Sequence, residues 1–78
     1  MDATEIGEAV KSARKRAGMT QHELAHASGL PQPSISRIES GTVIPRTSTL
    51  ITILRATGHR LAVEPIGPRS SGTPDQDA

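Results

Sequence analysis

Apolar side chains recur every three to four residues along much of the chain, and this spacing predicts short amphipathic helices. A first helix is expected from about Ala3 to Ala17, capped by Asp2 or Thr4. Its apolar face would consist of Ile6, Ala9, Val10, Ala13 and Ala17. A later helix is expected from about Thr47 to Ala56, where the buried residues would be Leu50, Ile53 and Leu54. A glycine follows each segment closely and would end the helix.

Residues 20–41, with the sequence TQHELAHASGLPQPSISRIESG, predict two further helices joined by a tight turn. Thr20 and Glu23 have the spacing of a capping box, in which each side chain accepts a hydrogen bond from the backbone amide of the other residue. An apolar stripe follows, made of Leu24, Ala25 and Ala27. Gly29 can then end the first of these helices in a left-handed conformation.

The second helix of this block is expected to begin near Gln32, because two prolines bracket that residue and proline suits only the first turn of a helix. Ile35 and Ile38 would be buried, and Gly41 would end the helix. The polar positions, expected to face outward, are Gln32, Ser34, Ser36, Arg37 and Ser40. Two helices of roughly eight residues joined by such a turn form a helix-turn-helix, which is a DNA-binding device.

The segment from His59 to Pro65 alternates between apolar and polar residues and is expected to be a β-strand. A single strand has no partner within the chain, whereas the same strand of a second chain can pair with it about a two-fold axis. We therefore expect a homodimer. Residues 66–78 are rich in Gly, Pro, Ser and Asp and are expected to form a disordered tail, which leaves residues 1–65 as the single domain.

The composition is that of a small domain that needs help from a partner subunit. With 78 residues and no Phe, Tyr or Trp, the core can contain only aliphatic side chains and alanine, so it contributes little stability. The chain has no cysteine, which excludes disulfides and thiolate metal sites. No segment resembles a signal peptide or a membrane span, and a cytoplasmic location is expected by default.

The formal net charge of +1 conceals a basic middle segment. From Val10 to Arg60, eight cations and two acids give a net charge of +6, and the remaining acids lie toward the two ends. A basic surface suits contact with phosphates, although lysine and arginine also simply solvate small proteins. Both interpretations remain open for Lys11, Lys15 and Arg16.

The block from Thr20 to Gly41 resembles the helix-turn-helix of the lambda-repressor-like, Xre/Cro-type regulators, because it fits their pattern TQ-x-ELA-x-x-(S/T)G-x-x-Q-x-x-IS-R-IE-x-G without a gap. The flanking stretches IGEAVKSARKRAGM and PRTSTLITILRATG resemble that family's first and later helices. The stretch GHRLAVEP resembles the short terminal strand of HipB-like antitoxins. The resemblance implies an all-α domain of four to five short helices, with a C-terminal β-strand that pairs across a homodimer.

The same resemblance implies a transcriptional repressor that reads an inverted-repeat operator in double-stranded DNA and occludes a promoter. Its HipB-like part implies an antitoxin that represses its own toxin–antitoxin operon and binds a HipA-like toxin kinase. A stand-alone Xre-type regulator is an alternative. A protein-interaction module that no longer binds DNA is another, because Pro31 and Pro33 stand where the family usually has a capping residue and often a base-reading residue.

The candidate DNA contacts are Gln21, Gln32, Ser34, Ser36, Arg37 and Arg46. By resemblance, Gln21 matches the glutamine that holds the DNA backbone, and Gln32 matches a position that reaches into the major groove. Gln32 can bond adenine through two hydrogen bonds and Arg37 can bond guanine or a phosphate, although both also suit an ordinary solvated helix. The two serines are short donors near phosphates or base edges, and Arg46 is expected to meet the DNA backbone.

Two further patterns carry other interpretations. Arg14 and Glu39 match positions that form a buried ion pair in the family, which implies a structural role. The string from His22 to His26 fits the HExxH motif of zinc proteases, but a catalytic zinc needs a third ligand, and the capping box and apolar stripe already explain the same letters. No other arrangement for catalysis is present, so we expect neither an enzyme nor a bound metal or cofactor.

Overall fold

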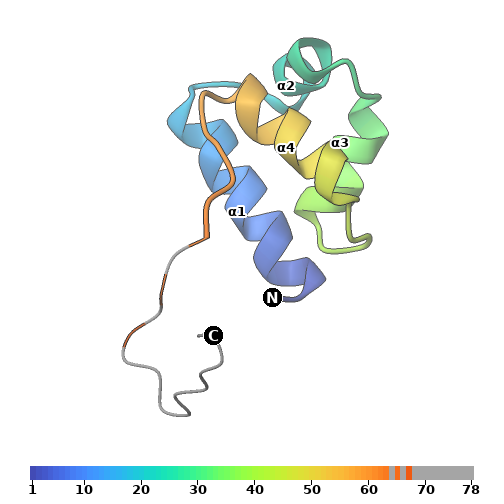
Figure 1. Cartoon of the computed structure of the whole chain (residues 1–78). Coiled ribbons are helices and arrows are strands. Elements are labelled where there is room, and N and C mark those ends of the chain that lie inside the picture. Colours follow the sequence, from blue (N-terminus) through green and yellow to red (C-terminus); the bar gives the residue numbers. More distant parts are fainter. Residues whose placement is uncertain (64, 66, 68–78) are drawn as a thin grey trace.

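The computed structural model describes residues 1–63, 65 and 67, and these residues contain four helices (Figure 1). α1 spans Ala3–Arg16, α2 Gln21–Ser28, α3 Gln32–Glu39 and α4 Thr47–Ala56. The four predicted helices are therefore confirmed, except that Ala17 caps the end of α1 rather than belonging to it. None of the described helices is long and apolar enough to cross a membrane.

Side-chain hydrogen bonds define where α1 and α2 begin. Asp2 and Glu5 form a capping box at α1, with the Glu5 amide donating to Asp2 Oδ1 at 2.8 Å and the Asp2 amide donating to Glu5 Oε1 at 3.0 Å. Thr20 and Glu23 form the predicted box at α2, with corresponding distances of 3.0 Å and 2.8 Å. Gly29 then ends α2 with a φ of 75°, a backbone conformation that favours glycine.

The other two helices begin without a side-chain cap. Pro31 is the N-cap of α3, and its carbonyl accepts hydrogen bonds from the amides of Ser34 at 3.0 Å and Ile35 at 3.3 Å. Pro33 lies in the first turn, where a missing amide breaks no intrahelical bond. Arg46 is the N-cap of α4. The first backbone amides of α3 and α4 therefore have no capping side chain and can bind water or a ligand.

The four helices pack around one core (Figure 1). Its side chains are aliphatic, as the composition predicts. α3 packs against both α1 and α2, and α4 packs against α2 and α1. The buried side chains of this core are Val10, Leu24, Ala25, Ile35, Ile38 and Ile53. The partly buried residues packed against it are Met19, Leu30, Leu50 and Ala56. Since every helix contributes at least one buried residue, the core fixes α3 relative to the other three.

Three alanines that the sequence pattern assigned to apolar faces are exposed: Ala9, Ala17 and Ala27. With 3.6 residues per turn, Ala27 lies about 200° round the helix axis from buried Ala25, and Ala9 lies about 200° from buried Gly7. Ala17 lies beyond the last residue of its helix. Hydrophobic character alone therefore over-assigned the core, because alanine is found equally well on an exposed helix face.

The segment after α4 does not form a strand in the single chain. Residues 59–63 and 65 have no regular secondary structure, and Glu64 lies outside the described residues. The predicted tail also lies outside them, apart from Gly67. The predicted strand pairs only with a second copy of itself, so the pairing and the homodimer remain predictions.

The start of this segment is held against the end of α4. The His59 amide donates to the Leu54 carbonyl at 2.8 Å, and His59 Nδ1 lies 3.1 Å from Oγ1 of buried Thr57. Beyond this anchor the apolar side chains face solvent, since Leu61 is 48% exposed and Val63 is fully exposed. Exposed apolar residues on an extended segment are what a pairing strand would present.

Candidate nucleic-acid interface

The surface of α3 divides into a buried side and an exposed side. Ile35 and Ile38 are 0% and 3% exposed and lie in the core. A contiguous arc on the other side is exposed, and we call it the exposed edge of α3; it consists of Gln32, Pro33, Ser36 and Arg37. The core thus holds the helix from behind while this edge stays open to contact, as the sequence predicted.

Ser34 does not share the exposed edge. It lies about 200° round the axis from Gln32 and is half-buried, next to the side that faces the core. The structure therefore brings Gln32, Ser36 and Arg37 together on one surface and leaves Ser34 at its margin. Whether any of them contacts DNA remains a prediction.

The two other candidate residues lie at the starts of helices. Gln21 is the first residue of α2 and is half-buried, whereas Arg46 is the exposed N-cap of α4. The backbone amides at a helix N-terminus carry a partial positive charge that favours an anion such as a phosphate. Both placements are compatible with the backbone contacts that the resemblance implies for these two residues.

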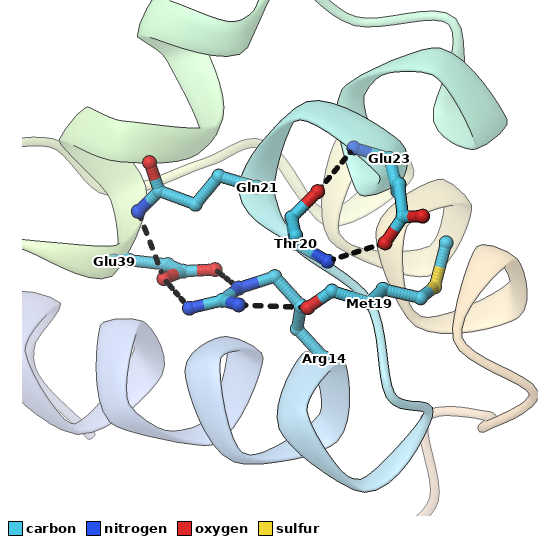
Figure 2. A network of polar contacts seen from close by, with 6 residues as sticks. All are labelled: Arg14, Met19, Thr20, Gln21, Glu23 and Glu39. Atoms are coloured by element: carbon cyan, nitrogen blue, oxygen red, sulfur yellow. Dashed lines mark hydrogen bonds and ion pairs between the residues drawn. The ribbon is translucent and has the colours of Figure 1, made fainter.

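The ion pair predicted between Arg14 and Glu39 is formed, and it joins α1 to the end of α3 (Figure 2). Arg14 Nε donates to Glu39 Oε2 at 2.7 Å and Arg14 Nη2 donates to Glu39 Oε1 at 3.0 Å. Arg14 Nη1 donates to the Met19 carbonyl at 2.8 Å. The two side chains are only 11% and 2% exposed, and the hydrogen bond with Glu39 raises the pKa of Arg14 above its ordinary value. Arg14 is therefore not available for phosphate contact.

Glu39 also accepts a hydrogen bond that the sequence did not predict. Gln21 Nε2 donates to Glu39 Oε1 at 3.1 Å, which joins a candidate DNA contact to the buried ion pair (Figure 2). The two residues are 18 positions apart and lie on different helices, so no local spacing could reveal the contact. The one feature of the sequence that points to this contact is that both residues belong to one helix-turn-helix block, in which the start of α2 meets the end of α3.

The zinc-protease string has no metal-binding geometry in the described part of the chain. Glu23 Oε1 accepts from the Thr20 amide, so this carboxylate belongs to the capping box. His22 and His26 lie on the exposed surface of α2. Among the residues that the structure describes, no group of three or more His, Cys, Asp or Glu side chains could hold a metal ion. The capping role accounts for the acid in this string.

Comparison with known proteins agrees with the helical arrangement. Residues 10–62 match the family model described as helix-turn-helix, which is more than half of the chain. The chain belongs to the helix-turn-helix family. The match covers the end of α1, all of α2, α3 and α4, and the segment that follows them. The matched residues of this helix-turn-helix protein include the exposed edge of α3 and the Arg14–Glu39 pair.

Two curated relatives of this helix-turn-helix protein are named as transcriptional regulators. It is 36% identical over 55 residues to an "Uncharacterized HTH-type transcriptional regulator" of Haemophilus influenzae, which is 70% of this chain and 56% of that protein. It is 37% identical over 60 residues to "Uncharacterized HTH-type transcriptional regulator y4dL" of Sinorhizobium fredii, which is 77% of this chain and 31% of that protein. The aligned part thus spans about half of the first relative and about a third of the second. Neither is named as an antitoxin.

Proposed function

We propose that this helix-turn-helix protein is a sequence-specific DNA-binding transcriptional regulator that acts as a homodimer and represses by occupying a promoter. The observation that carries the proposal is the exposed edge of α3, which presents Gln32, Ser36 and Arg37 to solvent while Ile35 and Ile38 hold the helix in the core. The family match and the names of the two relatives support the same function. Such a regulator acts on the chromosome. Both relatives are bacterial proteins, so the proposed location is the cytoplasm.

In the proposed mechanism, α3 enters the major groove with its N-terminal residues against the base edges. The side-chain amide of Gln32 can bind adenine through two hydrogen bonds, because its nitrogen can donate to N7 and its oxygen can accept from the N6 amino group. Arg37, about a turn and a half further along, contacts guanine or a phosphate. Two such helices related by a two-fold axis would reach grooves roughly 34 Å apart, which requires an inverted-repeat operator.

The backbone contacts are assigned to Gln21 and Arg46. Arg46 adds a full positive charge at the start of α4, where the helix has no side-chain cap of its own. Exposed cations elsewhere, such as Lys15 and Arg16 in the last turn of α1, add to the attraction without specifying a sequence. Affinity would come mainly from phosphates and specificity from the exposed edge of α3.

An antitoxin role is a narrower prediction within this function. It depends on the likeness of residues 58–65 to the terminal strand of HipB-like proteins, and neither relative's name extends it to this chain. The decisive observation is whether the neighbouring gene encodes a kinase-like toxin that copurifies with this protein. A neighbour of unrelated kind would leave the stand-alone regulator as the function.

The proposed function is tested by fluorescence anisotropy with a labelled duplex taken from the promoter region of the protein's own gene. Binding should weaken steeply as salt rises, because each neutralised phosphate releases counterions. A duplex of scrambled sequence serves as the control and should bind more weakly at every salt concentration. Absence of binding to any promoter fragment at low salt would instead favour the interaction module, for which Pro31 and Pro33 at the start of α3 are the specific observation.

Two substitutions separate base contacts from backbone contacts in the same assay. Gln32→Ala should reduce the preference for the promoter duplex over the scrambled duplex by about 1 to 3 kcal/mol, because a base contact is lost. Arg46→Ala should weaken binding to both duplexes alike and lower the salt dependence by about one phosphate. If Gln32→Ala weakened both duplexes equally, the assignment of Gln32 to base reading would be wrong.

A further inference from the structure

The hydrogen bond between Gln21 and Glu39 fixes which end of the Gln21 amide faces the protein. Both oxygens of Glu39 accept hydrogen bonds from Arg14, and a carboxylate paired in this way offers acceptors only. The nitrogen of the Gln21 amide must therefore face Glu39, and the oxygen points away from it (Figure 2). Glu39 thus selects one of the two orientations that a free glutamine amide would adopt with similar ease.

This orientation leaves a donor available beside the start of α2. The amide nitrogen of glutamine carries two hydrogens, and Glu39 Oε1 accepts only one of them. The second has no acceptor among the residues that the structure describes, and Gln21 is only half-buried. A DNA phosphate has acceptor oxygens alone, so it can bind this nitrogen but not the amide oxygen.

The ion pair does not need Gln21 for its own stability. Arg14 already donates to both oxygens of Glu39, at 2.7 Å and 3.0 Å, and a third N–H group of Arg14 donates to the Met19 carbonyl. Gln21 adds a longer third bond, at 3.1 Å, from a more exposed position. The contact therefore does more for the orientation of Gln21 than for the neutralisation of Glu39.

We propose that Arg14 and Glu39 are positioning residues for DNA binding, because they hold the Gln21 amide so that one nitrogen bridges Glu39 and a DNA phosphate. The inference rests on the proposed DNA-binding function and adds a role to a pair that otherwise only joins α1 to α3. Arg14 holds the Glu39 side chain in place, Glu39 orients the amide, and Gln21 contacts the phosphate.

A double-mutant cycle tests this coupling in the full chain with the labelled promoter duplex. Gln21→Ala in the wild-type background should raise the Kd about tenfold, because a hydrogen bond to a charged group is lost. The second background is Arg14→Met/Glu39→Met, which replaces the buried pair by apolar side chains and is expected to keep the fold. In that background Gln21→Ala should raise the Kd less than about twofold. An amide that Glu39 does not orient must lose side-chain entropy on binding, so it adds little to the affinity.

The control is Thr52→Ala, an exposed position on α4 whose effect on the Kd should be the same in both backgrounds. The inference is overturned if Gln21→Ala raises the Kd by the same factor in both, or has no effect in the wild type. If the wild type binds DNA while the cycle is additive, only the positioning role fails. If the wild type does not bind, the proposed function fails and this inference fails with it.

A second measurement uses the unmodified protein and does not depend on whether the variants fold. In ¹⁵N-resolved spectra, both side-chain amide protons of Gln21 should shift when DNA is added to saturation, because the bridge engages both of them. Side-chain amide signals of Gln21 that stay unchanged at saturating DNA would contradict the bridge.

Discussion

Gly7 of α1 lies against the backbone of α3, where there is no room for a side chain. A glycine in the middle of a helix predicts only a slight weakening of that helix, yet Gly7 is buried beneath the backbone of α3. A β-carbon at this position would overlap the Ile38 carbonyl oxygen and lie 2.8 Å from the Glu39 carbonyl oxygen. The missing side chain therefore permits the close approach of α1 to the helix that carries the exposed edge.

Gly7→Ala should destabilise the protein by about 1 to 3 kcal/mol, because backbone atoms cannot move aside as a flexible side chain can. The free energy of unfolding is measured by urea denaturation. Glu8→Ala, at an exposed position of the same helix, is the control and should change it by less than about 0.5 kcal/mol. An increase in stability for Gly7→Ala, as helix propensity alone would give, would show that the close approach is not a constraint.

At the scale of elements, the sequence predicted the helices well because their ends are marked by local chemistry. Thr20 with Glu23 and Gly29 mark both ends of α2 through contacts within a few residues. The buried isoleucines of α3 fixed which side of that helix would be exposed, and hence the places of Gln32 and Arg37. Local patterns were sufficient for these features.

The contacts that the sequence did not predict are those between elements. The Gln21–Glu39 bond joins two helices, and the burial of Gly7 depends on where α3 crosses α1. The exposure of Ala27 depends on which side of α2 meets its neighbours. All three features are set by packing geometry, which residue spacing along one element does not specify.

Thr20→Ala tests how far the capping box stabilises α2. It should lower the free energy of unfolding by about 1 kcal/mol, because the Glu23 amide loses its acceptor at the start of a two-turn helix. Asp2→Ala removes the matching cap from α1 and should also lower the free energy of unfolding, because the Glu5 amide loses its acceptor. Equal stabilities for Thr20→Ala and the wild type in thermal unfolding would refute the capping role.

The described part of the molecule has a small core and, after α4, a segment with exposed apolar side chains. Seven apolar side chains are buried among the residues that the structure describes, and none of them is aromatic, so a second chain would add stability that the single chain lacks. Leu61 and Val63 are exposed where strand pairing would cover one side of the segment. A two-fold dimer would also match the symmetry of an inverted-repeat operator, so the proposed DNA binding and the strand pairing both call for two chains.

Ala62→Pro/Val63→Pro should convert the expected dimer into a monomer in sedimentation velocity. Proline lacks the backbone donor, and of two successive residues in a paired strand at least one donates to its partner. Both positions are exposed and outside regular structure, so the single domain should stay folded. Ala62→Thr/Val63→Thr keeps both amides and should remain dimeric. A proline variant that sediments as a dimer would rule out strand pairing as the basis of assembly.

In the proposed function, the exposed edge of α3 is the surface that reads DNA. The most direct test is a backbone chemical-shift titration of the ¹⁵N-labelled protein with its promoter duplex. The largest changes are predicted at residues 32–37, with further changes at Gln21 and Arg46. Binding accompanied by changes confined to other surfaces, such as exposed Val43 and Ile44 or residues 59–63, would contradict the claim.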